Sequence, residues 1–137
     1  MTGKPVVPAP IGGRPLELDR YADPRFAFAD WLTAPDNPWF AKNIVNRIWF
    51  WLMGRGIVHE ADDIRPDNPP WCPELLTYLE KELVANRYDL KHIFRLILNS
   101  STYQLSSVPT AENAADETGF SHYRVRRLDA EIGRAHV

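Results

Sequence analysis

The chain has 137 residues, of which 45% are hydrophobic and 25% are charged, as is typical of one soluble globular domain. Its 16 basic and 18 acidic residues give a formal net charge of −2, which argues against a nucleic-acid-binding protein with a basic surface. The single cysteine, Cys72, excludes an internal disulfide framework and a haem-attachment motif, and the longest apolar run, 48–53, is too short to span a membrane.

Proline and glycine crowd the first part of the chain, so residues 1–22 are predicted to form an extended linker. These residues lack the charged and apolar regions of a signal peptide. Asp23-Pro24 then offers an N-cap and a proline at the first helical position, which predicts a helix over 24–34. Its apolar residues recur at helical spacing: Phe28, Trp31 and Leu32.

A second helix is predicted from Asn37-Pro38 to Met53, because its apolar residues also recur at helical spacing and Gly54 follows at the expected end. The apolar side carries Phe40, Ala41, Ile44, Val45, Ile48, Trp49 and Leu52. The opposite, polar side is predicted to carry Lys42, Asn43, Asn46 and Arg47. Residues 55–70 form a long connection, with a short strand predicted at 56–58.

Two further helices are predicted, one opening at Cys72-Pro73 and one capped by Asp89. Their apolar faces consist of Leu75, Leu76, Leu79, Leu83 and Val84, and of Leu90, Ile93, Phe94, Ile97 and Leu98. A short helical turn is predicted at Tyr103 and Leu105, followed by a polar loop over 106–118. No segment alternates long enough to predict a sheet, so we predict an all-α domain over 23–131. It has about four main helices and long irregular loops, as an orthogonal or irregular helical bundle.

Several short motifs follow one another in a fixed order: Asn46-Arg47-Ile48-Trp49, Gly54-Arg55-Gly56-Ile57-Val58, Asp62-Asp63, ILNSSTY over 97–103, and Arg126-Arg127-Leu128-Asp129-Ala130-Glu131. As an ordered set they resemble a domain of unknown function (fifteen fifty-three) at the C-terminus of large exported proteins typical of planctomycetes. The resemblance implies an exported or cell-envelope location and upstream domains of the same polypeptide, often including a cytochrome-c-like domain. Any haem is therefore expected on an upstream domain, and no cofactor is expected in this segment.

The end of the chain departs from this family pattern. The family continues a helix beyond residue 131, whereas the last six residues here match one reading frame of a common sequencing adapter. We therefore expect the helical domain to be truncated at its C-terminus and residues 132–137 to be a non-native tail.

Four polar residues form the candidate binding site. The Arg47 guanidinium is a planar fork suited to carboxylate, phosphate or sugar hydroxyls, which makes it a ligand anchor in the functional interpretation. In the structural interpretation, which we favour, it forms a buried or half-buried ion pair that fixes the long loop on the helix. The acidic run 59–63 fits no established cation-binding loop, so we predict no metal, and no catalytic residue is identified. The candidates are Asn46, Arg47, Asp62 and Asp63.

Five tryptophans complete the set of candidate residues. Trp31 and Trp49 are expected in the core, and Trp39, Trp51 and Trp71 at the surface, where they contact a neighbouring domain or stack on sugar. The favoured function is an accessory, interaction domain that docks on upstream domains. The alternative is part of a redox-linked or carbohydrate-directed enzyme with a polar site near the four candidate residues. A deep pocket there favours the enzyme, whereas exposed apolar surface with paired polar groups favours docking.

Overall fold

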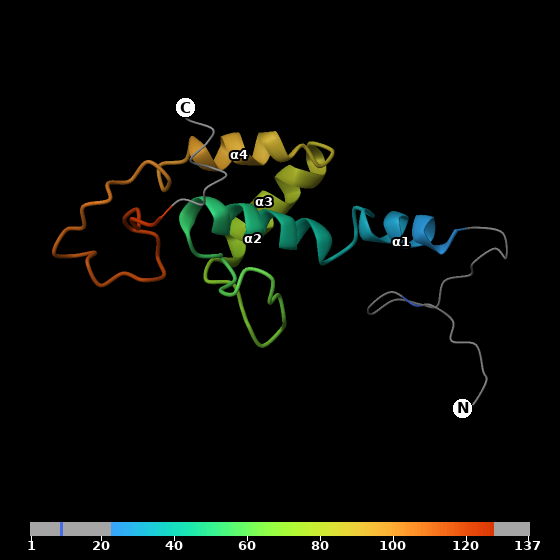
Figure 1. Cartoon of the computed structure of the whole chain (residues 1–137), viewed down its shortest axis with the longest axis horizontal. Coiled ribbons are helices and arrows are strands. Elements are labelled where there is room, and N and C mark those ends of the chain that lie inside the picture. Colours follow the sequence, from blue (N-terminus) through green and yellow to red (C-terminus); the bar gives the residue numbers. More distant parts are fainter. Residues whose placement is uncertain (1–8, 10–22, 128–137) are drawn as a thin grey trace. The chain divides into compact units, whose positions relative to one another are not determined.

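The computed structural model describes residue 9 and residues 23–127. These residues form an all-α structure, as predicted, with four helices: α1 (Pro24–Leu32), α2 (Phe40–Met53), α3 (Pro73–Ala85) and α4 (Leu90–Leu98) (Figure 1). None of these helices has the length and apolar character needed to cross a bilayer. The expected tail at 132–137 and nearly all of the expected linker lie outside the described residues.

The chain divides into two compact units, residues 1–40 and 41–137. In the first unit Asp23 caps α1 as predicted, because its side chain accepts a hydrogen bond from the Arg25 backbone N–H at 3.0 Å. Trp31 is only partly buried, beside a half-exposed Phe28 at a ring-centroid distance of 5.6 Å. The prediction that Trp31 is a core residue is therefore wrong, since α1 has no fully buried side chain among those described and provides no core for the ring to enter.

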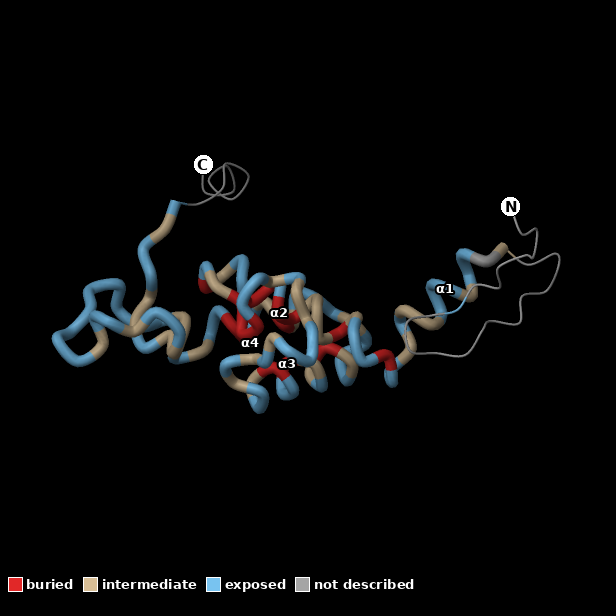
Figure 2. The backbone as a smooth tube through the Cα atoms, turned by 90° about the horizontal axis from the view of Figure 1, so that it is seen from below, coloured by how far each residue is buried: buried red, intermediate tan, exposed pale blue. Residues whose placement is uncertain are grey.

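The core lies in the second unit, where the apolar faces of α2, α3 and α4 meet two residues of the connecting loop (Figure 2). The helical residues follow the predicted spacing: Ala41, Val45, Ile48, Trp49 and Met53 from α2, Leu76, Leu79 and Leu83 from α3, and Ile93 and Ile97 from α4. The loop residues are Ile57 and Val58. Burial of each large apolar side chain stabilises the fold by about 1.5–3 kcal/mol.

The short strand predicted at 56–58 does not form. Ile57 and Val58 are each 1% exposed, but no neighbouring strand pairs with them. Instead the Ile57 carbonyl accepts a hydrogen bond from the Trp71 backbone N–H at 2.8 Å, and Val58 pairs with a side chain of α2. Two β-branched residues can be buried outside a sheet when their backbone N–H and C=O groups bond to partners other than a neighbouring strand, which is the case for Ile57 and Val58.

The segment after α4 begins with a turn over 101–104, where the Gln104 backbone N–H donates to the Ser100 carbonyl at 3.3 Å. Leu105 lies just beyond that turn, so the predicted helical turn is shorter than expected. The predicted loop over 106–118 is irregular, as expected. The Tyr123 backbone N–H donates to the Ser106 carbonyl at 3.0 Å, which joins the start of this loop to the segment just beyond its end.

Candidate functional site

Asn46 is completely buried, although the sequence placed it on the polar side of α2. Its Oδ1 accepts a hydrogen bond from the Val58 backbone N–H at 2.9 Å. Its Nδ2 donates to the carbonyls of Val58 and Ala61 at 3.2 and 2.8 Å. The carboxamide therefore satisfies both backbone groups of Val58, as a neighbouring strand would, and both of its own amide protons are used. Asn46 holds the loop on α2 and offers no free donor to a ligand.

The loop approaches Asn46 closely because two glycines flank Arg55. Gly54 adopts a φ of 79°, which ends α2 in the left-handed conformation as predicted. A Cβ at Gly56 would lie 3.1 Å from both Nδ2 and Oδ1 of Asn46 and would overlap the Val58 carbonyl oxygen. We call Asn46, Gly56, Val58 and Ala61 the Asn46 clasp. The glycine at position 56 is required for it, since any side chain there would displace the Asn46 carboxamide.

Arg47 pairs with Asp62, as the structural interpretation predicted. Its Nε lies 3.0 Å from Oδ1 and its Nη2 lies 2.5 Å from Oδ2, so the contact is bidentate. The hydrogen bonds, and next the charge of Asp62, raise the pKa of Arg47. The guanidinium carbon also lies 5.9 Å from the centroid of the Trp51 ring.

The Arg47–Asp62 pair is not buried, which corrects the expectation of a buried or half-buried pair. The two side chains are 44% and 58% exposed. The reason is that Asn46, the neighbouring residue on α2, occupies the buried position against the loop and leaves Arg47 facing solvent. Exposed ion pairs are screened by water and salt and contribute little to stability.

Asp63 pairs with Arg65 rather than with Arg47, at an Nε–Oδ1 distance of 2.7 Å. The side-chain amide of Asn68 also bonds within this loop, donating to the backbone carbonyls of His59 and Asp63 at 2.8 and 2.9 Å. All four predicted binding residues therefore have protein partners around one ordered loop. Among the described residues no group of three or more acidic, histidine or cysteine side chains is arranged to hold a metal ion.

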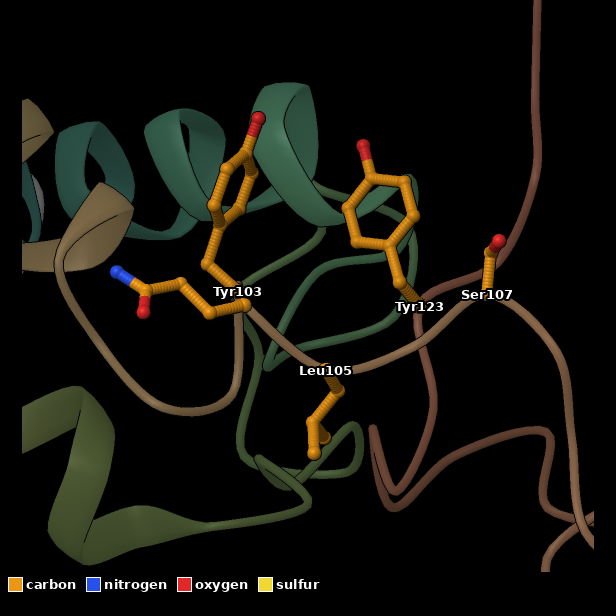
Figure 3. A pocket seen from close by; sticks show the side chains of 5 residues that line it. Tyr103, Leu105, Ser107 and Tyr123 are labelled. Carbon is orange, nitrogen blue, oxygen red and sulfur yellow. The ribbon is translucent and has the colours of Figure 1, made fainter.

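A pocket of about 340 Å³ lies on the segment that follows α4, and sequence reasoning did not identify it as a site. Its lining residues are Tyr103, Gln104, Leu105, Ser107 and Tyr123, which we call the tyrosine pocket (Figure 3). The two tyrosine rings lie 5.5 Å apart at an interplanar angle of 79°, on the same side of the backbone in Figure 3. Burial is the main cause that raises the pKa of Tyr103, followed by the electrostatic effect of Tyr123. Tyr103 is therefore a neutral phenol at neutral pH.

The tryptophans other than Trp31 lie as predicted. Trp49 is 2% exposed and belongs to the core. Trp39, Trp51 and Trp71 are 36%, 45% and 52% exposed. The Phe120 ring stands nearly perpendicular to both Trp71 and Trp49, at centroid distances of 6.0 and 5.3 Å. A row of aromatic rings therefore connects the core to the surface of the second unit.

Comparison with known proteins identifies the family of this chain. Residues 24–137 match the model of the family described as PSD1, protein of unknown function (DUF1553). No curated protein and no solved structure shows a significant match to the chain. The matched range contains all four helices, the Asn46 clasp and the tyrosine pocket.

Proposed function

For this chain, which belongs to the PSD1 family of proteins of unknown function (DUF1553), we propose the role of a helical interaction domain that docks on another domain of the same polypeptide. One observation carries this proposal: aromatic side chains are exposed, whereas the polar candidates bond to each other or to the backbone. Trp51 and Trp71 are about half exposed. Large aromatic side chains are typical anchors of protein interfaces, where they become buried.

The partner and the location follow from the resemblance of the sequence motifs. We propose that the partner is an upstream domain of an exported or cell-envelope protein of planctomycete type. A cytochrome-c-like domain in such a protein would hold the haem, and this segment would hold no cofactor. In this arrangement the helical domain contributes contact surface rather than chemistry.

The alternative, a redox-linked or carbohydrate-directed enzyme with a site near Arg47, Asp62 and Asp63, has less support. A ligand that uses the Arg47 guanidinium has to displace the bidentate bond from Asp62. Asn46 has no donor left, and Asp63 pairs with Arg65. These residues form a bonded loop rather than a set of free groups around a substrate.

Hydroxyl-radical footprinting tests the docking proposal. The oxidation rates of Trp51 and Trp71 are compared between the 137-residue chain and the complete gene product. We expect at least one of the two to be oxidised more slowly in the complete product, because the partner domain covers it. Trp49 is the matched control, since it is buried in the core and should react slowly in both proteins. Equal rates for Trp51 and Trp71 in the two proteins would overturn the proposal, as would a complete gene product without a further domain.

A further inference from the structure

The tyrosine pocket combines aromatic surface with uncharged polar groups. It is a shallow pocket that is largely open to solvent, and its volume of about 340 Å³ lies near the lower end of the range of small-molecule sites, roughly 300–1,000 Å³. The lining consists of two phenol rings, one carboxamide, one hydroxyl and one leucine side chain. We infer that this pocket binds a neutral, polyhydroxylated ring, that is, a sugar residue of an uncharged glycan.

The neutral character of the lining selects against charged ligands. No Asp, Glu, Lys, Arg or His side chain is among the five lining residues. The pKa of Tyr103 is raised, mainly by burial, so that this phenol stays protonated. The nearest cation is Arg126, whose charge acts on Tyr103 but which does not line the pocket and already donates to the Trp51 carbonyl. A charged ligand would therefore lose water in this pocket for only partial compensation, which is unfavourable.

The remaining groups suit a sugar ring. Tyr103 and Tyr123 stand nearly perpendicular, so the pair leaves aromatic face for the C–H groups of a ring and aromatic edge for its hydroxyl oxygens. The Ser107 hydroxyl makes no hydrogen bond to any described residue. Gln104 donates through Nε2 to the Leu98 carbonyl at 3.4 Å, which leaves its Oε1 as an acceptor. Neutral donors and acceptors beside an aromatic surface match the alternating hydroxyl and C–H groups of a sugar.

The pocket is held in shape without a ligand. The Tyr123 backbone N–H donates to the Ser106 carbonyl at 3.0 Å, which joins the two walls. The Tyr123 hydroxyl donates to the Leu52 carbonyl at 3.2 Å, and the Arg126 guanidinium donates to the Trp51 carbonyl. Both carbonyls belong to the last turn of α2, where the helix leaves acceptors without partners. A pre-formed pocket loses less conformational entropy when a ligand binds.

The test measures binding of defined oligosaccharides to the 137-residue chain by isothermal titration calorimetry and saturation-transfer NMR. The neutral probes are cellotetraose, xylotetraose, mannotetraose and chitotetraose, and the charged probe is tetragalacturonate. We expect at least one neutral probe to bind and the charged probe not to bind at the same concentration. Absence of binding by all four neutral probes overturns the proposal, and so does equal binding of tetragalacturonate.

Two substitutions assign the binding to the pocket. Ser107→Ala removes one hydroxyl from the lining and should weaken binding about fivefold, as expected for the loss of one neutral hydrogen bond. Tyr103→Leu removes an aromatic face and should weaken binding about tenfold or more. Ser101→Ala is the matched control, because Ser101 is exposed on the same segment but does not line the pocket. If Ser101→Ala and Ser107→Ala have the same effect, the sugar binds elsewhere and the assignment is wrong.

Discussion

Replacing Asn46 by alanine should destabilise the second unit strongly. The substitution removes the acceptor for the Val58 N–H and the donor for the Val58 carbonyl, and Val58 is only 1% exposed. Each buried backbone group left without a partner costs about 1–3 kcal/mol, so these two groups together cost about 2–6 kcal/mol. The Ala61 carbonyl is partly exposed and can bond to water instead. We therefore expect a loss of about 4 kcal/mol, out of the roughly 5–15 kcal/mol typical of a domain.

Equilibrium unfolding in urea, followed by tryptophan fluorescence, measures this loss as a lower midpoint with an unchanged slope. Asn43→Ala is the matched control, because Asn43 lies one turn earlier on α2 and is partly exposed. A surface substitution of this kind should change the free energy of unfolding by less than about 0.5 kcal/mol. If Asn46→Ala is no more destabilising than Asn43→Ala, the clasp does not hold the loop and the reasoning fails.

Four further perturbations test the clasp and other parts of the structure. Gly56→Ala should destabilise at least as much as Asn46→Ala in the same urea assay, because the new Cβ overlaps a carbonyl oxygen of the clasp; a small effect would contradict the close approach. The two substitutions combined should cost less than the sum of their separate effects, since both break the same contact. Arg47→Ala should leave the urea midpoint unchanged within error, because its ion pair is exposed, and a clear drop would show that the pair is stabilising. Near the end of the long loop, the Ser121 hydroxyl and then backbone N–H groups lower the pKa of Asp116 below its usual 3.8. Its contribution should persist above that value and disappear only as the pH falls through the lowered pKa, so the Gly119 amide resonance should keep its folded position at pH 4 and move only in stronger acid.

The helices were predictable because their signals are local. Asp23 and Asp89 are placed as N-caps by their position before helical runs, and both side chains accept the expected backbone N–H bonds. Gly54 marks the end of α2 through the conformation that glycine readily adopts. Apolar spacing then identifies the buried face of each of α2, α3 and α4, because a helix brings residues three and four apart to the same side.

The burial of Asn46 was not predictable from the same pattern. Helical periodicity predicts that a polar residue lies on the solvent side of the helix. Asn46 is buried instead because the buried backbone N–H and C=O groups of the loop need hydrogen-bond partners. That need depends on Ile57 and Val58 being buried without a strand partner, which the sequence suggests only through their apolar character. The tyrosine pocket was missed for a related reason. Its two tyrosines are 20 residues apart in the sequence, and irregular backbone brings them together.

The motifs that carry the family resemblance now divide by their physical roles. Asn46 and Gly56 belong to the Asn46 clasp and Gly54 ends α2 just before it, so these motif residues determine a loop conformation rather than a reaction. The ILNSSTY motif ends at Tyr103 and shapes the approach to the tyrosine pocket. The Ser100 hydroxyl donates to the Ile97 carbonyl at 2.6 Å and accepts from the Tyr103 backbone N–H at 3.2 Å. A search for function in this domain is therefore better directed at the pocket and the exposed tryptophans than at the arginine and acids of the loop, since the charged groups of the loop are already paired with one another.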